Sequence, residues 1–325
     1  MRASVAICCF LLLASFAAAE AQTGAESYPS KPVKLIYGFP SGSTGDIRAR
    51  AYAQRLAETL GQPFVVENRP GASAAIAAEA VIKAPADGYT ILFGTIQELV
   101  FNPVLSASVR YDPLRDLAPI SFGSGGYPML LVPQSLGVKS VAELVRLGTT
   151  MPGNLNCGTA GYATMHHFGC AYFAKQAGLR ILTVPYKGPA PALVDAASGQ
   201  VQMALGYVVE SQQYIESKKL VPLAIFGPRR LDAFPEVPTM MELDYPGLEL
   251  FSWSCFMAPA GTPAHVVRRL NAEVIKVATR PDMVEWLTQT AAVFMPFNPE
   301  EFGDFLRSEI AKWRKISDAT GIKAE

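Results

Sequence analysis

Residues 33–60 read VKLIYGFPSGSTGDIRARAYAQRLAETL. The first five form a short apolar run with β-branched residues, which predicts a buried strand over 33–37. From Asp46 to Leu60, apolar residues recur at helical spacing, which predicts an amphipathic helix that Gly61 ends. A loop rich in glycine and hydroxyl side chains, residues 40–45, joins the two. The stretch is therefore a strand–loop–helix unit, as expected for an α/β fold.

The same alternation continues along the chain in two blocks. We expect the first block to bend into the second near the glycine-dense residues 122–126, and a flexible stretch at 227–230 to follow the second block. The helices after that stretch need a sheet to cover, so the chain should return to the first lobe. This predicts a discontinuous lobe 1 (22–122 and 228–325) and a lobe 2 (123–227), each a mostly parallel sheet flanked by helices. The predicted strands are 33–37, 64–67, 90–93, 129–132, 155–157, 182–185, 201–205, 223–226 and 248–258, and the predicted helices are 46–60, 74–84, 141–147, 164–176, 190–198, 263–279, 282–290 and 299–319.

The N-terminus matches a secretory signal peptide. A positive start is followed by an uncharged, apolar run over 3–19 and an A-x-A cleavage site at 19–21. The run is shorter than the roughly 20 residues that a membrane-spanning helix needs. We therefore expect residues 1–21 to be removed on export to the periplasm.

The charge balance and the cysteine content of the chain argue against several classes of protein. Twenty-eight basic and 28 acidic residues balance, which argues against nucleic acid or an anionic membrane surface as a partner. Three cysteines remain after processing: Cys157, Cys170 and Cys255. With no C-x-x-C spacing we expect no zinc site. Cys157 and Cys170 could form a disulfide, but small apolar packing is the favoured interpretation.

The loop over 40–45 suits an anion. A loop between a strand and a helix N-terminus presents free backbone N–H groups and the positive end of the helix dipole. Hydroxyl groups of Ser41, Ser43 and Thr44 add donors. The loop lacks the Gly-Lys-Ser/Thr of a phosphate-binding loop and the G-x-G-x-x-G of a dinucleotide site. A plain capped turn remains an equal alternative for this loop taken alone.

A second loop of the same kind, residues 158–164, lies in the other predicted lobe. Two helix N-termini that face one cleft could hold one carboxylate between them and close the lobes on it. Tyr162 could stack on a ligand or form a hydrogen bond with it. His166 and His167 follow in the first helical turn, where packing and capping are the ordinary roles.

Catalysis finds little support in the sequence. The chain has three histidines and contains neither the G-x-S-x-G of a nucleophile elbow nor the H-E-x-x-H of a metalloprotease. We therefore predict no catalytic residue, no metal and no cofactor. A secreted α/β hydrolase and a ligand-binding sensor for a signalling partner remain alternatives.

The mature chain resembles the tripartite tricarboxylate transporter receptors, which are Bug-type periplasmic binding proteins. The resemblance implies a two-lobed Venus-flytrap fold of type II, closure around a small carboxylate, and delivery to membrane transporter subunits. It also implies ordered waters in the site, and we expect a monomer. The segments that carry it are 28–33, 39–46 with Ala49 and Arg50, 65–72, 86–90, 184–188, 234–239 and 258–263.

The candidate ligand-binding residues combine the two loops with positions that the resemblance implies. The family commonly has Pro-Gly-Gly where this chain has Ser41-Gly42-Ser43. An Asp-Asn pair of the family is replaced by Gly206 and Tyr207. This loss of a carboxylate predicts a di-, tri- or aromatic carboxylate ligand in preference to an amino acid. The candidates are Ser41, Gly42, Ser43, Thr44, Asp46, Thr95, Thr159, Ala160, Gly161, Tyr162, Thr164, His167 and Tyr207.

Overall fold

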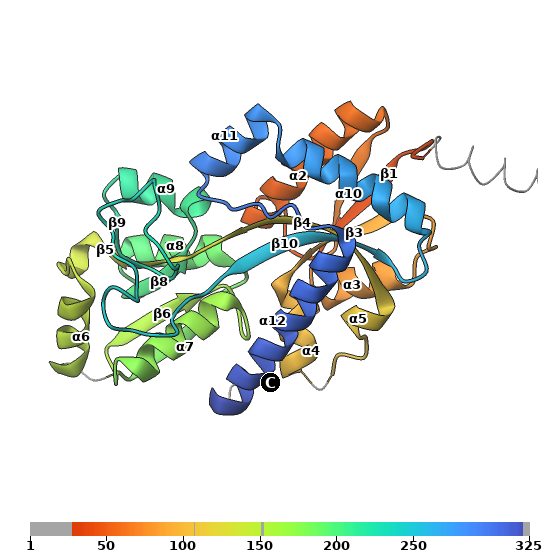
Figure 1. Cartoon of the computed structure of the whole chain (residues 1–325). Helices are drawn as coiled ribbons and strands as arrows, with labels where there is room; N and C mark the ends of the chain where they lie inside the picture. Colours follow the sequence, from red (N-terminus) through yellow and green to blue (C-terminus); the bar gives the residue numbers. More distant parts are fainter. Residues whose placement is uncertain (1–27, 107, 151–152, 321–325) are drawn as a thin grey trace, which may run out of the picture.

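The computed structural model describes residues 28–320 except 107, 151 and 152. The predicted signal peptide, residues 1–21, lies outside these. The described residues form two five-stranded sheets, one in each half of the molecule (Figure 1). None of the helices described is both long enough and apolar enough to cross a membrane.

The first sheet has the strand order β2-β1-β3-β10-β4 and is mixed. The prediction of mostly parallel sheets was wrong in this detail, because in each sheet two of the four strand pairings are parallel and two are antiparallel. β1 pairs in parallel with β2 and β3, whereas β10 is antiparallel to β3 and β4. Because β1 lies between β2 and β3 and is covered on both faces, its sequence reads as an apolar run. The strands are β1 (Val33–Tyr37), β2 (Phe64–Asn68), β3 (Thr90–Thr95), β4 (Leu117–Gly126) and β10 (Ser252–Pro259).

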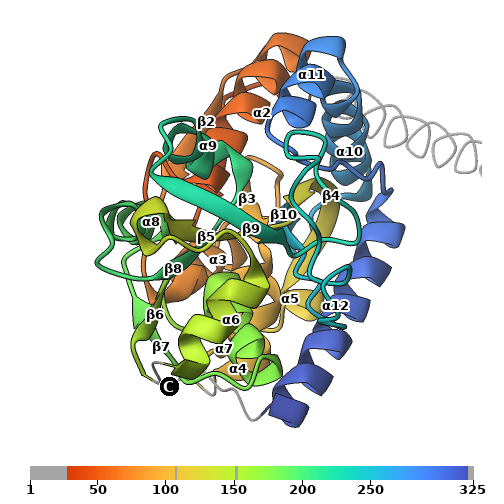
Figure 2. The same cartoon turned by 90° about the vertical axis from the view of Figure 1, so that its left-hand side faces the viewer.

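Helices cover both faces of this sheet. Buried residues of α2, α10 and α11 form one core cluster on one face, and those of α3 and α12 belong to the cluster on the other. The C-terminal helices α10 and α12 both contact β4, and α12 runs along one side of the molecule (Figure 2). These helices are α2 (Thr44–Leu60), α3 (Ala75–Ile82), α10 (Ala264–Ala278), α11 (Pro281–Gln289) and α12 (Pro299–Thr320), with the short α4 (Asn102–Leu105) and α5 (Pro113–Asp116) nearby.

The second sheet has the order β7-β6-β8-β5-β9. β6 is parallel to β7 and β8, and β5 is antiparallel to β8 and β9. Helices α6 and α7 cover one face, and α8 and α9 cover the other. The strands are β5 (Met129–Pro133), β6 (Leu155–Thr159), β7 (Ile181–Pro185), β8 (Met203–Gly206) and β9 (Leu220–Ile225), and the helices are α6 (Val141–Thr150), α7 (Met165–Gln176), α8 (Pro189–Ser198) and α9 (Val208–Glu216).

The glycine-dense residues 122–126, where the sequence predicts a bend between the two blocks, form the end of the ten-residue strand β4. β4 pairs with β10 up to Gly126, and the chain passes to β5 through Tyr127 and Pro128. A Cβ atom at Gly125 would lie 2.2 Å from the ring of Phe251, so glycine there makes room for an aromatic side chain. Close packing, and not a bend, explains that glycine.

Cys157 and Cys170 form a disulfide, so the interpretation of these residues as unpaired apolar packing was wrong. The bond joins β6 to α7, across Cα atoms 6.2 Å apart. Both residues are almost completely buried, which is compatible with a disulfide and with apolar packing of free thiols. Cys255 is a free, buried thiol, and burial raises its pKa.

Candidate functional site

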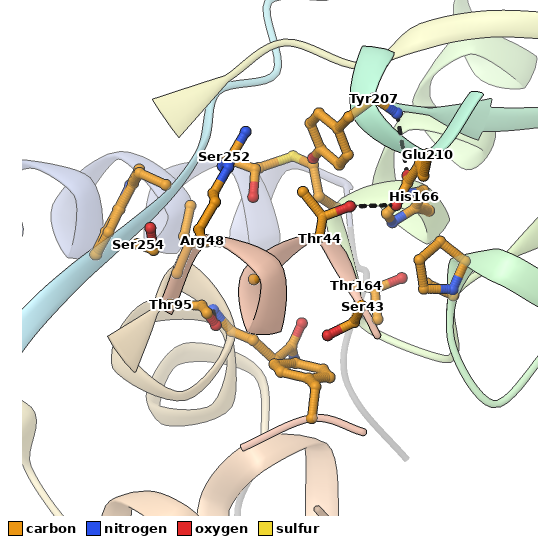
Figure 3. Close-up of a pocket in the computed structure, with 18 of the residues that line it drawn as sticks. Ser43, Thr44, Arg48, Thr95, Thr164, His166, Tyr207, Glu210, Ser252 and Ser254 are labelled. Carbon is orange, nitrogen blue, oxygen red and sulfur yellow. Dashed lines mark hydrogen bonds and ion pairs between the residues drawn. The ribbon is translucent and has the colours of Figure 1, made fainter. Parts of the chain in front are cut away.

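A cavity lies between the two halves of the molecule (Figure 3). It encloses about 730 Å³ of empty space, including its open mouth. The N-terminal turns of α2 and α7 border it, together with the ends of β1 and β3, the start of β10 and residues at the start of α9. Its lining residues are Tyr37, Phe39, Ser43, Thr44, Gly45, Arg48, Thr95, Ile96, Gln97, Ala160, Thr164, Met165, His166, Pro189, Tyr207, Glu210, Ser252, Trp253 and Ser254.

The first loop reaches this cavity through Ser43 and Thr44. Ser43 caps α2, because its hydroxyl accepts a hydrogen bond from the N–H of Asp46 at 3.4 Å. Gly45 allows the ring of Tyr37 to approach: a Cβ atom there would overlap the phenol oxygen. The positive end of a 17-residue helix therefore borders the cavity with hydroxyl groups beside it.

Asp46, Ser41 and Gly42 belong to the loop but not to the cavity lining. The Asp46 carboxylate accepts bonds from the N–H of Gly42 at 2.9 Å, from Arg50 at 3.0 Å and from Asn68 at 2.8 Å. Burial opposes ionisation of Asp46, but the bonds from Arg50, Gly42 and Asn68 outweigh it and lower the pKa of the carboxyl. The observed role of Asp46 is to hold the loop in shape.

The second loop reaches the cavity through Ala160 and Thr164. Thr164 caps α7 by accepting a bond from the N–H of His167 at 3.3 Å, and its hydroxyl donates to the carbonyl of Gly161 at 2.8 Å. His167 accepts the N–H of Ala163 at Nδ1, and burial lowers the pKa of its imidazole.

The remaining candidates of the second loop lie outside the lining. Thr159 is buried, and its hydroxyl lies within 3.5 Å of the carbonyls of Gly161 and Val184. Tyr162 is 53% exposed and packs edge-on against the ring of His167. The histidine that does line the cavity is His166, one position earlier on α7. Neighbouring residues on a helix face different directions, and the sequence did not distinguish the two.

Thr95 and Tyr207 both line the cavity, from opposite lobes. Thr95 donates to the buried carboxyl of Glu98 from its N–H at 2.8 Å and from its hydroxyl at 2.5 Å. Burial raises the pKa of Glu98 to about 7, although the bonds from Thr95 oppose the shift. Glu98 thus supports the turn that presents Thr95.

Arg48 is the most informative residue that the sequence analysis missed. As a charged residue that is not among the apolar positions of the helix, Arg48 is expected to face solvent, yet it is only 7% exposed and lines the cavity. Among the described residues it has no hydrogen-bond or ion-pair partner, and its Nε is fully buried. Burial lowers its pKa, and the nearby Tyr207 and Glu210 oppose that effect. Arg48 lies three residues after Gly45 and four before Tyr52, which places the three residues on one face of the helix. This spacing is the sequence signal that could have predicted its burial.

Glu210 is the second charged residue among those lining the cavity. Its carboxylate accepts the Thr44 hydroxyl at 2.5 Å and the backbone N–H of Tyr207 at 3.0 Å. The nearest imidazole nitrogen of His166 lies 3.8 Å away. The Thr44–Glu210 bond joins α2 to α9, and therefore one half of the molecule to the other (Figure 3). The cavity thus keeps a carboxylate close to the position where the sequence analysis noted the loss of one.

The family model of the tripartite tricarboxylate transporter family receptor matches residues 48–322. The chain belongs to this family. Its members are solute-binding receptors. BugT of Bordetella pertussis is 33% identical over 305 residues, which cover 93% of each chain.

Solved structures agree with this assignment. The structure of R. palustris Rpa4515 with adipate has a TM-score of 0.87 at 34% identity and covers 91% of this chain and 99% of that one. MatC from Rhodopseudomonas palustris, with bound malate, has a TM-score of 0.82 at 27% identity and covers 89% and 99%. The predicted two-lobed α/β fold of periplasmic binding proteins is confirmed.

Proposed function

We propose that this protein is a periplasmic receptor that captures a small carboxylate between its lobes and delivers it to a tripartite membrane transporter. The observation that carries the proposal is the convergence of two helix N-termini on one cavity. α2 comes from one half and α7 from the other. Each N-terminus offers backbone N–H groups, a positive dipole end and hydroxyl groups, which together favour an anion.

The chemistry of the lining supports a carboxylate. Hydroxyl groups of Ser43, Thr44 and Thr164 stand beside the two N-termini. In this structure each hydroxyl donates its hydrogen to another group of the protein, so each has to turn in order to donate to a ligand. Arg48 adds a positive charge that forms no ion pair with any described side chain. The relatives solved with adipate and with malate hold small carboxylates in the same fold. Ordered water would complete the contacts of a small ligand in a cavity of this size.

Lobe closure is the proposed mechanism. The lobes, 22–122 with 228–325 and 123–227, would separate to admit the ligand and close over it. The Thr44–Glu210 bond supports this, because it joins the lobes at the cavity itself. A ligand shifts such an equilibrium only by its differential affinity for the closed form. Delivery would then depend on the transporter binding the closed monomer.

A thermal-shift screen of the purified mature protein tests capture. Mono-, di- and tricarboxylates and aromatic acids form the panel, with sugars and amines as negative controls. A ligand at 100 times its Kd adds about 2.7 kcal/mol of stability. Thr44→Val should weaken the response, whereas Thr288→Val, an exposed threonine on α11, should not. The proposal fails if no carboxylate raises the melting temperature.

Delivery needs a separate test in cells. Deleting the gene should abolish uptake of the radiolabelled ligand, and the wild-type gene should restore it. Binding in vitro with unchanged uptake in the deletion strain would exclude the transport role and favour a sensor.

A further inference from the structure

Arg48 is a buried cation in the lining of the cavity between the two halves of the molecule. Its side chain is more than nine-tenths buried, and its guanidinium has no ion-pair or hydrogen-bond partner among the residues that the structure describes. An arginine stays protonated in proteins, so burial cannot be relieved by loss of the proton. Buried charges are normally paired, because leaving them unpaired is costly. Arg48 therefore needs a partner that comes from outside the chain.

Glu210 does not serve as that partner. It is the other charged residue among those described in the lining, but no ion pair joins it to Arg48. One of its oxygens accepts the Thr44 hydroxyl, and the other accepts the N–H of Tyr207. Each oxygen thus already accepts one hydrogen bond that helps to hold the lobes or α9 in place. The positive charge of Arg48 is left for the ligand.

The guanidinium lies apart from the two helix N-termini. Arg48 is four residues beyond Thr44 on α2, a rise of about 6 Å along the helix axis. Its side chain extends toward Ser252 and Tyr207, away from Ser43 and Thr164 (Figure 3). A Cβ atom on Gly126, the last residue of β4, would lie 3.5 Å from Nη2 of Arg48. The cation therefore lies where β4 leaves for the second sheet, at the other end of the cavity.

We propose that Arg48 is a specificity-determining residue that binds a second acidic group, so that the ligand is a dicarboxylate held at both ends. One carboxylate lies at the N-termini of α2 and α7, as in the proposed function on which this inference rests. The other lies on the guanidinium of Arg48. A monocarboxylate leaves the buried cation unpaired and binds more weakly for that reason.

Calorimetric titration of matched ligand pairs tests the assignment. Straight-chain dicarboxylates from malonate to pimelate are compared with the monocarboxylate of the same chain length, such as adipate with hexanoate. The proteins are the wild type, Arg48→Met, Arg48→Lys and the control Arg115→Gln, an arginine exposed on α5. Arg48→Met should weaken the best dicarboxylate about a hundredfold, and the monocarboxylate less than about threefold. Arg48→Lys should fall between the two, and the control should match the wild type.

A second measurement does not depend on ligand. Removing an unpaired buried charge should raise the melting temperature of the ligand-free protein in Arg48→Met, and a lower melting temperature would contradict an unpaired cation.

In the titrations, an equal loss of affinity for the dicarboxylate and the monocarboxylate in Arg48→Met would show that Arg48 holds the only carboxylate. No loss of affinity for either ligand would show that Arg48 holds no carboxylate. Either result overturns this inference and leaves the proposed function standing. Binding of no carboxylate by the wild type would refute both.

Discussion

The buried carboxyl of Glu98 should make stability depend on pH. Glu98 is fully buried in the turn after β3, and its partners are the N–H and hydroxyl of Thr95. Burial raises its pKa from 4.5 to about 7. The folded state therefore holds this proton more tightly than the unfolded state does. Its contribution to stability is complete below about pH 4.5 and is lost as the pH rises to about 7.

The size of the effect follows from the shift. A rise from 4.5 to about 7 corresponds to a loss of about 3 kcal/mol across that interval. Glu98→Gln keeps the shape without an ionisable group. Its amide oxygen can accept the N–H of Thr95, and its NH2 group can donate to the Thr95 hydroxyl oxygen, which reverses the direction of that bond. The free energy of unfolding of this variant minus that of the wild type should therefore be smallest at pH 5 and rise to roughly 3 kcal/mol at pH 8.

Urea denaturation followed by tryptophan fluorescence at pH 5, 6, 7 and 8 measures this difference. Contributions from other groups cancel, because both proteins contain them. Glu79→Gln, on the exposed face of α3, is the matched control and should give a flat difference. A difference for Glu98→Gln that does not change with pH would refute the assignment of a raised pKa to Glu98.

Three further predictions concern the supports of the cavity. Asp46→Asn should lower the free energy of unfolding by about 2 kcal/mol, because the loop loses charge-assisted hydrogen bonds. The control Asp282→Asn, at a half-exposed carboxylate, should have little effect. Equal midpoints of urea denaturation for the two variants would contradict this prediction. Thr44→Val removes the hydrogen bond between the lobes, so the lobes of the ligand-free protein should open and its radius of gyration in X-ray scattering should increase. An unchanged radius of gyration would show that this bond does not hold the lobes together. Reducing the Cys157–Cys170 disulfide should cost about 3 kcal/mol, and a melting temperature unaffected by dithiothreitol would contradict that.

The sequence predicted the strand–loop–helix units well because their signals are local. The apolar run over 33–37 and the helical spacing after Asp46 depend only on neighbouring residues, and β1 and α2 lie where they were expected. The two loops were also found, since each joins a strand to a helix N-terminus. Ser43, Thr44, Thr95, Ala160, Thr164 and Tyr207 were expected at the site, and all line the cavity.

What the sequence could not supply depends on contacts between distant parts of the chain. Arg48 is charged, which ordinarily marks a solvated helix position, and the groups near its buried side chain include Tyr207 and Glu210, which are far away in the sequence. Glu210 is 166 residues from its partner Thr44. Gly125 suggested a bend because the ring of Phe251 that needs the space lies on another segment. The spacing of apolar residues predicts which face of a helix or strand is buried, but it does not predict which other segment packs against that face.

The disulfide between β6 and α7 has a consequence for the rate of ligand capture. It closes a covalent ring around the loop that carries Ala160 and Thr164. The conformational entropy of this loop is therefore lost during folding and oxidation, and not a second time when a ligand enters. A preorganised loop therefore leaves ligand capture limited by diffusion and by the opening of the entrance.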